Sequence, residues 1–262
     1  MTARPLRAAV AFTVALVALS GLAYLLQQTL YARPTTMDLT PAAAGQPGQP
    51  PSAVPAAPAV PSVPSGSEAA SGGESDVPVI DETWLQQTST ASGVPVTALR
   101  AYARAELMAP GGCGIGWTTL AGIGWVESQH GLIGGRVLLL DGRSSEPILG
   151  PALNGVGNVM AIPATRESRR WHGDKVWDHA FGPMQFISST WVAWQSDGDG
   201  DGVSDPNDLD DAAYAAARYL CAGERDLASA AGWTAGILSY NNARSYLDAV
   251  HVAATAYADR TR

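Results

Sequence analysis

Glu127 is the residue whose position most favours acid–base chemistry. It lies in the apolar segment 117–131, which we expect to form a helix that ends near Gly131. Because Glu127 follows Leu120 by seven residues and Ile123 by four, it continues the apolar face of that helix near its C-terminus. Burial and the negative end of the helix dipole both disfavour the ionised carboxylate. The sequence therefore predicts a neutral general acid, and the alternative is a glutamate that reaches solvent at the helix edge.

Two further segments carry side chains suited to a sugar. Gly182 and Pro183 predict a tight bend that presents three side chains on one rim, Met184, Gln185 and Phe186. A mixed apolar and amide surface fits the face of an N-acetyl sugar. After an apolar helical run, the Tyr240 hydroxyl and the Asn241 amide could orient a sugar or the acid. The alternatives are a buried turn and an asparagine that caps a helix.

Taken in order, these three segments resemble the motifs of a known family. They are similar to motifs of bacterial lytic transglycosylases. The segments are Gly-Trp-Val-Glu-Ser, which contains Glu127, Gly-Pro-Met-Gln-Phe from Gly182, and Ser-Tyr-Asn ending at Asn241. Those motifs are Glu-Ser, Gly-Leu/Pro-Met-Gln and Tyr-Asn, in enzymes with a goose-lysozyme-like fold. The likeness is to the membrane-bound lytic transglycosylase B type in its actinobacterial form, and it covers about residues 95–254.

The resemblance implies a reaction and a role for each motif. Glu127 would protonate the glycosidic oxygen between N-acetylmuramic acid and N-acetylglucosamine in peptidoglycan, then accept a proton from the muramic 6-hydroxyl. The product would be a 1,6-anhydro sugar. An internal hydroxyl then replaces the second carboxylate of ordinary glycosidases. The implied substrate-binding residues are Ser128, Met184, Gln185, Phe186, Tyr240 and Asn241, and Asp178 is a candidate for a supporting role.

Three other functions stay open from the sequence. A muramidase that hydrolyses the same bond would keep Glu127 but needs a water and usually a second carboxylate, such as Asp178 or Asp141. A non-catalytic wall-binding module is expected only where the acid is replaced. Glu127 and His130, three residues apart, could also bind a metal from one helix, but no second Glu-x-x-His occurs.

Residues 197–208 match the pattern of an EF-hand calcium loop. Oxygen-bearing side chains stand at positions 1, 3, 5, 9 and 12, with glycine at position 6 and a backbone carbonyl at position 7. The expected ligands are Asp197, Asp199, Asp201, Val203, Asp205 and Asp208. Aspartate in place of the usual glutamate at position 12 should weaken binding. We expect a structural Ca²⁺ and no cofactor for catalysis; an acidic turn without metal is the alternative.

Apolar spacing predicts a mostly helical domain around these residues. Periods typical of amphipathic helices occur over residues 96–108, 117–126, 191–194, 212–221, 233–238 and 246–257. Residues 136–140 and 147–149, separated by a turn at residues 141–143, are expected to pair as two strands. With the resemblance, the expected fold is predominantly α, of the lysozyme-like α+β kind, with a small β-hairpin insertion and an EF-hand-like loop.

The N-terminal part of the chain differs in composition from the rest. Arg4 and Arg7 precede an uncharged apolar stretch over residues 8–26, as in an export signal or a membrane anchor. We therefore expect an extracytoplasmic protein, either secreted into the cell wall or held at the membrane by an uncleaved segment. The expected organisation is a signal peptide or anchor, a Pro/Ala/Ser-rich disordered linker and a lysozyme-like domain, over residues 1–31, 32–76 and 77–262.

Charge excludes one class of partner, and the cysteine content bears on the cellular compartment. A formal net charge of -8 and a pI near 4.9 argue against nucleic acid, whose phosphates require clustered lysine and arginine. The two cysteines, Cys113 and Cys221, are in no CxxC arrangement. In an oxidising compartment they are expected to form a disulfide, and two buried thiols are the alternative. The protein is expected to act as a monomer on peptidoglycan strands.

Overall fold

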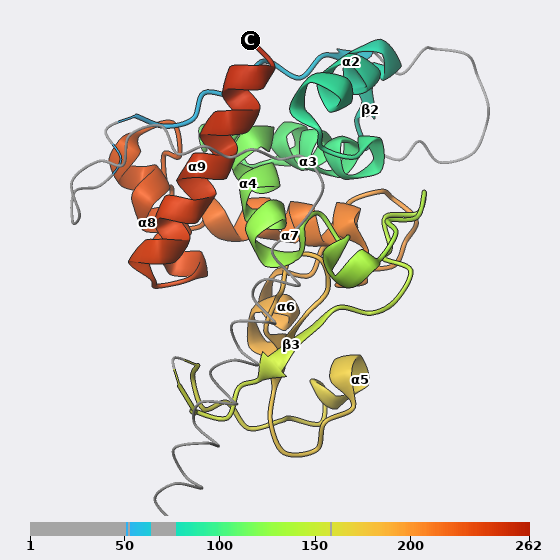
Figure 1. Cartoon of the computed structure of the whole chain (residues 1–262), viewed down its shortest axis with the longest axis vertical. Helices are drawn as coiled ribbons and strands as arrows, with labels where there is room; N and C mark the ends of the chain where they lie inside the picture. Colours follow the sequence, from blue (N-terminus) through green and yellow to red (C-terminus); the bar gives the residue numbers. More distant parts are fainter. Residues whose placement is uncertain (1–50, 52, 64–76, 158) are drawn as a thin grey trace, which may run out of the picture. The chain divides into compact units, whose positions relative to one another are not determined.

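Helices make up most of the regular structure in the computed structural model, which describes residues 51, 53–63, 77–157 and 159–262 (Figure 1). In chain order they are α2 Glu82–Ser92, α3 Val96–Met108, α4 Trp117–Ser128, α5 Arg169–His172, α6 Ser188–Trp194, α7 Leu209–Leu220, α8 Ala230–Tyr240 and α9 Arg244–Arg260, with a 3₁₀ turn, η1, at Ile133–Gly135. The predicted signal or anchor, residues 1–31, lies outside the described residues. Among the helices that are described, none is both long enough and apolar enough to cross a membrane.

The described strands are short and form two antiparallel pairs. Strand β1 (Ser62–Val63) pairs with β2 (Val79–Ile80), and β3 (Leu149–Ala152) pairs with β4 (His179–Phe181). The register of the second pair shifts between Leu149 and Ala152, as at a β-bulge. The predicted class, predominantly helical with a small β element, is confirmed.

Helix α4 is the central element. It is apolar on all sides rather than amphipathic as expected, which suits a helix that packs against α3, α7 and α9. It packs chiefly against α9, and α3 packs against both α4 and α7. Glycines make these contacts close: a Cβ on Gly122 would lie 3.0 Å from Val250 O, and a Cβ on Gly124 would overlap the Tyr102 hydroxyl. The helix that carries Glu127 is therefore held rigidly by its neighbours.

Just after α4, His130 links three helices through one buried polar bridge. Its Nδ1 lies 3.0 Å from the hydroxyl of Tyr102 in α3, and its Nε2 lies 2.9 Å from the hydroxyl of Tyr257 in α9. Burial lowers the pKa of His130 to about 3, so the ring is neutral, with one nitrogen donating and the other accepting. Since both nitrogens are engaged, His130 is not free to bind a metal together with Glu127.

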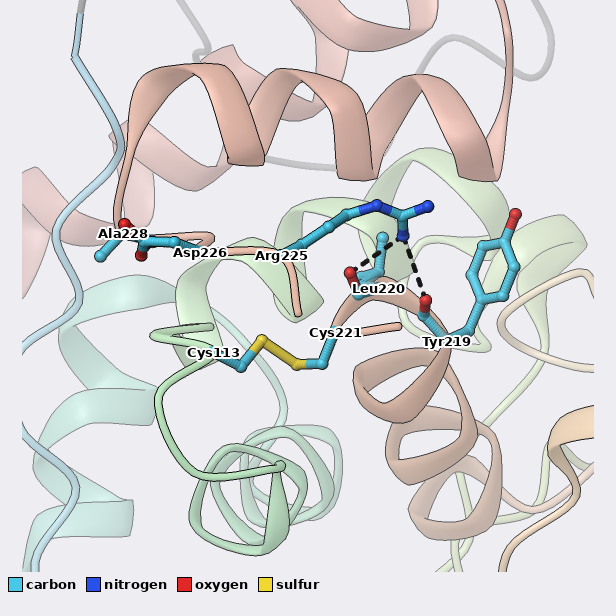
Figure 2. Close-up of a disulfide and its surroundings, with 7 residues drawn as sticks. All are labelled: Cys113, Tyr219, Leu220, Cys221, Arg225, Asp226 and Ala228. Atoms are coloured by element: carbon cyan, nitrogen blue, oxygen red, sulfur yellow. Dashed lines mark hydrogen bonds between the residues drawn. A yellow bond between two sulfur atoms is a disulfide. The ribbon is translucent and has the colours of Figure 1, made fainter. Parts of the chain in front are cut away.

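A disulfide joins Cys113 and Cys221, as predicted, with their Cα atoms 5.5 Å apart (Figure 2). It ties the segment before α4 to the end of α7. Beside it, Arg225 Nη1 donates to two terminal carbonyls of α7, Tyr219 O at 3.3 Å and Leu220 O at 3.1 Å. The bond is compatible with an oxidising, extracytoplasmic compartment.

The expected hairpin is correct at its turn but wrong in its second strand. Leu138 faces Ser144, and Leu139 N donates to Arg143 O at 2.8 Å. The tight turn reverses the chain at Arg143, so residues 143–145 are the ones that pair with the first strand of the hairpin. Residues 147–149 do not pair with residues 136–140; Leu149 instead begins β3, whose partner is β4.

Part of the predicted disordered linker lies against the folded unit. All described residues belong to one compact unit, Leu39–Arg262. Within it, residues 53–63 run along the domain, Pro55 is buried and β1 is paired with β2. For these residues the expectation of a free tether is not met.

Candidate active site

Glu127 lies one residue before the end of α4, where the chain turns away. Three consecutive residues after the helix have positive φ, namely Gln129 (54°), His130 (61°) and Gly131 (84°). The amides of Gln129 and His130 close the turn by donating to Trp125 O (3.0 Å) and Gly124 O (2.9 Å). Because the helix ends here, Glu127 is only half-buried and keeps access to solvent.

The surroundings of Glu127 bring the pKa of its carboxyl close to neutral pH. Burial raises the pKa of its carboxyl to about 7, and a hydrogen bond from Tyr246 acts in the opposite direction. The Tyr246 hydroxyl donates to Glu127 Oε1 at 2.6 Å. Near neutral pH the carboxyl therefore populates both its protonated and its ionised form, which is what a group serving as acid and then as base requires.

Tyr246, which the sequence did not single out, belongs to an aromatic cluster with the predicted Tyr240. Their rings are nearly parallel, with 6.5 Å between centroids and 6° between planes. The Tyr240 hydroxyl donates to Met184 O at 2.7 Å, and its ring meets Phe186 edge-on. The cluster thus joins the turn after β4 to Tyr246 and, through Tyr246, to Glu127.

Two residues predicted to bind substrate are buried instead. Met184 is 0% exposed and Phe186 is 3% exposed. Apolar side chains gain most by leaving water, so these two fill the core beneath the turn rather than line its rim. Phe186 supports Tyr240 through its ring, and Met184 does so through its backbone carbonyl.

Ser128, also predicted to bind substrate, is a buried link between two motifs. Its hydroxyl donates to Pro183 O at 2.5 Å and accepts from Gly131 N at 2.8 Å. It therefore fastens the end of α4 to the turn at Pro183, and its burial leaves it inaccessible to a ligand in this structure.

Glycine at 182 allows that turn to pack closely on another loop. Gly182 has φ of 75°, and a Cβ there would overlap Pro206 O. Phe181 and Phe186 exchange backbone hydrogen bonds of 2.9 and 3.0 Å across the turn. The turn is thus closed upon itself and packed against Pro206 of the Asp-rich loop.

The two amide residues named from the sequence, Gln185 and Asn241, keep solvent access. Gln185 is partly exposed, and its Nε2 donates to Gly182 O at 2.9 Å. Asn241 is exposed directly after Tyr240, where its backbone N–H donates to Ile237 O at 3.1 Å and ends α8. Gln185 and Asn241 are the predicted amides that a ligand can reach.

Asp178 is a structural carboxylate of another part of the domain. It is 2% exposed, and its Oδ1 accepts from Ser188 Oγ at 2.8 Å and from His172 Nε2 at 3.0 Å. The Asp174 amide donates to Nδ1 of His172, so the proton of that ring is on Nε2. Asp178 therefore joins α5, β4 and α6, and its contacts do not support a role at Glu127.

The Asp-rich loop gathers a different set of carboxylates from the one expected. Oxygens of Asp197, Asp199 and Asp211 all lie within 4.8 Å of one another. Burial, together with the charges of Asp199 and Asp197, raises the pKa of Asp211 to about 7, against hydrogen bonds from backbone amides. A cation would relieve this repulsion, and carboxylate oxygens are the ligands that Ca²⁺ prefers. The residues present therefore fit a Ca²⁺ ion.

Of the other expected ligands, Asp205 and Asp208 have partners outside the cluster, whereas Asp201, like Asp197 and Asp199, accepts from a backbone amide of the loop. Asp201 Oδ1 accepts from Val203 N at 2.7 Å, and Asp205 Oδ2 lies 3.0 Å from Arg143 Nη2. Asp208 caps α7 by accepting from Asp210 N at 2.9 Å. Burial and the charges of Asp211 and Asp210 raise the pKa of Asp208 to about 8. The carboxylate expected at position 12 thus serves as a helix cap, and Asp211 takes its place in the cluster.

Comparison of the chain with models of protein families, with curated proteins and with solved structures gave no match. The function of this site therefore has to follow from its own residues and their contacts.

Proposed function

We propose that the chain is a lytic transglycosylase of bacterial peptidoglycan with a lysozyme-like catalytic domain. The observation that carries this proposal is the half-buried Glu127 carboxyl, which has a pKa of about 7 and accepts a hydrogen bond from Tyr246. The resemblance of three ordered motifs, ending at Glu127, Gln185 and Asn241, supplies the substrate class. The contacts of Ser128 with Pro183, and of Tyr240 with Met184, support the idea that these motifs act together.

Glu127 takes part twice in the proposed reaction. Its neutral form donates a proton to the glycosidic oxygen between N-acetylmuramic acid and N-acetylglucosamine, and the bond from that oxygen to the muramic C1 breaks. Positive charge develops at C1, and the oxygen of the muramic 6-hydroxyl bonds to it. The hydroxyl proton passes to the Glu127 carboxylate, which restores the acid. No water is consumed, so the 1,6-anhydro product is one water lighter than a hydrolysed end.

The surroundings of Glu127 favour this route over hydrolysis. A hydrolytic enzyme usually needs a second carboxylate to activate water or to act as nucleophile. Among the described residues, burial and the Tyr246 hydrogen bond account for the pKa of Glu127, without a contribution from another carboxylate. Asp178 is committed to its own hydrogen bonds, and Asp141 is exposed in the hairpin turn, 3.6 Å from Arg143.

The proposal includes a structural calcium ion and an extracytoplasmic location. Asp197, Asp199 and Asp211 would hold the ion, and Asp201 and the Val203 carbonyl stay predicted ligands from the sequence pattern. The bound ion would neutralise the clustered carboxylates and leave the chemistry to Glu127. Peptidoglycan strands would be the partner of a monomer that is secreted or held at the membrane by its N-terminal segment.

Digestion of purified peptidoglycan tests the activity. We expect the wild-type protein to release 1,6-anhydromuropeptides, identified by mass spectrometry, and Glu127→Gln to release none. Glu106→Gln is the matched control, because burial also raises the pKa of Glu106 to about 7 while its carboxylate accepts from Trp117 N at 2.5 Å. Glu106→Gln should keep the wild-type products.

Each other result contradicts the proposal in its own way. Products with hydrated reducing ends would identify a muramidase. Binding to peptidoglycan without any release by the wild type would identify a wall-binding module. Anhydro products from Glu127→Gln would show that another group is the acid.

A further inference from the structure

The proline-rich segment over residues 53–63 is fastened to the domain at both ends (Figure 1). Near its start, His251 Nε2 in α9 donates to Ala53 O at 2.9 Å. Near its end, Asp81 N donates to Pro61 O at 3.2 Å, and β1 pairs with β2, Ser62 facing Ile80. These contacts hold one extended stretch of chain across the surface.

Over residues 53–60 the exposure of this segment repeats every three residues. Residues 53, 56 and 59 are exposed, residues 54, 57, 58 and 60 are partly buried, and Pro55 is buried; Pro61 and Ser62, at the end of the segment, are both exposed. Prolines stand at the same interval, at 55, 58 and 61. A polyproline II helix has about three residues per turn, so this period is what docking along one side of such a helix produces. Because proline has little freedom to lose, a segment of this composition docks at a low entropic cost.

The middle of the segment makes its closest approach at a glycine. A Cβ on Gly116 would lie 2.6 Å from the Cβ of Ala57, and its next neighbours would be no nearer than 3.7 Å. Residues 54–57 also line a pocket of about 310 Å³ together with Glu106, Ile115 and Thr119. The connection before α4 therefore has room for Ala57 because residue 116 is a glycine.

We propose that residues 53–63 form a built-in strap that docks against the α3–α4 connection, α9 and β2. On this proposal the linker ends at Ala53, beside His251, rather than at residue 77. Removing residues 53–76 from the free linker shortens its greatest polyproline reach by on the order of 70 Å. The strap is independent of the activity proposed above, since none of its contacts involves Glu127 or the residues around it.

Hydrogen exchange of the full chain tests the strap through the amide of Asp81, whose acceptor is Pro61 O. We expect this amide to be protected in the wild type. Gly116→Ala should speed its exchange by about tenfold or more, because overpacking of a tight contact favours the open state. Gly111→Ala is the matched control: a Cβ there meets nothing within 4 Å, so exchange should stay at the wild-type rate.

A compensating exchange separates the strap from general damage to the fold. Ala57→Gly removes the atom that Gly116→Ala would strike, so the double variant should recover slow exchange at Asp81. The strap is overturned if the Asp81 amide of the wild type exchanges like that of an unstructured peptide. It is also overturned if Gly116→Ala leaves the rate unchanged, or if the double variant exchanges as fast as Gly116→Ala alone.

Discussion

Tyr246 offsets part of the effect of burial on the pKa of Glu127. The hydroxyl of Tyr246 donates to Glu127 Oε1, although the two residues are 119 positions apart in the chain. A hydrogen bond to a carboxylate favours its ionised form and so offsets part of the effect of burial. Without this tyrosine, Glu127 would hold its proton to a higher pH.

Tyr246→Phe should therefore move the pH dependence of the reaction. The pKa of Glu127 rises further when the hydrogen bond is lost, so the acid form persists and the alkaline limb of anhydro-product release moves upward by about one pH unit. Tyr240→Phe is the control, because its hydroxyl donates to Met184 O and not to Glu127. An equal shift in both variants, or a downward shift in Tyr246→Phe, contradicts this role for Tyr246.

At the scale of residues, the sequence singled out Glu127 as the candidate acid but not the residues around it. The apolar spacing before Glu127 predicted a carboxyl that is hard to ionise, and burial raises its pKa to about 7. Motif order could not tell which atoms face a ligand, so Ser128, Met184 and Phe186 were assigned to substrate although they are buried. Tyr246 was missed because no local pattern connects it to Glu127.

At the scale of elements, periodic or strongly apolar segments were predictable, whereas a polar helix and a single helical turn were not. The bounds of α3, Val96–Met108, coincide with the predicted segment, whereas α2 was missed because its sequence is mostly polar. Helix α2 is instead specified by its ends: the Asp81 side chain accepts from Trp84 N at 2.7 Å, and Gly93 ends it with φ of 80°. Helix α5 is a single turn of four residues, too short for any period.

The Asp-rich loop shows how a helix changes the spacing of a motif. The EF-hand pattern counted twelve residues and selected Asp208, but that carboxylate begins α7 as its cap. The chain enters the first turn of the helix, where Asp211 points back toward Asp197 and Asp199. A ligand set that spans a loop and a helix cannot be obtained from loop spacing alone.

Calorimetry with Ca²⁺ distinguishes the two ligand sets. Asp211→Asn should weaken binding by about tenfold or more, since affinity follows the number of charged ligands. Asp208→Asn should have little effect, because asparagine is also a good helix cap and preserves the start of α7. The reverse order of effects would restore the twelve-residue pattern. Absence of binding to the wild-type protein would remove calcium from the proposal.

At the scale of the whole molecule, the disulfide closes a long stretch of chain. Cys113 and Cys221 are 108 residues apart, and closing a loop of this length is worth up to about 4–5 kcal/mol on the chain-entropy model. The sequence predicted this bond from compartment and cysteine number. The pairing was unambiguous because the chain has two cysteines.

Calorimetric melting tests the contribution of the bond. We expect the double variant Cys113→Ser, Cys221→Ser to melt about 10 °C below the wild type. A reductant should lower the melting temperature of the wild type to that of the variant and leave the variant unchanged. A wild-type protein whose melting temperature does not respond to reduction, with its thiols shown to be free, would contradict a stabilising role.

The boundary of the domain was the least predictable large-scale feature. Composition placed residues 32–76 together as a linker, yet residues 53–63 lie against the domain. The interval of three between Pro55, Pro58 and Pro61 is visible in the sequence. What cannot be read there is the surface that accepts them, because Gly116 and His251 come from segments far along the chain.

The buried hydrogen-bonded bridge through His130 does not change its protonation near neutral pH. With a pKa of about 3, this imidazole gains no charge between mildly acidic and neutral surroundings. The hydrogen bonds that His130 makes with Tyr102 and Tyr257 therefore stay the same throughout that pH interval. This bridge therefore adds nothing to a titration of the protein across that interval, whereas Glu106 and Asp211, each with a pKa of about 7, titrate there together with Glu127.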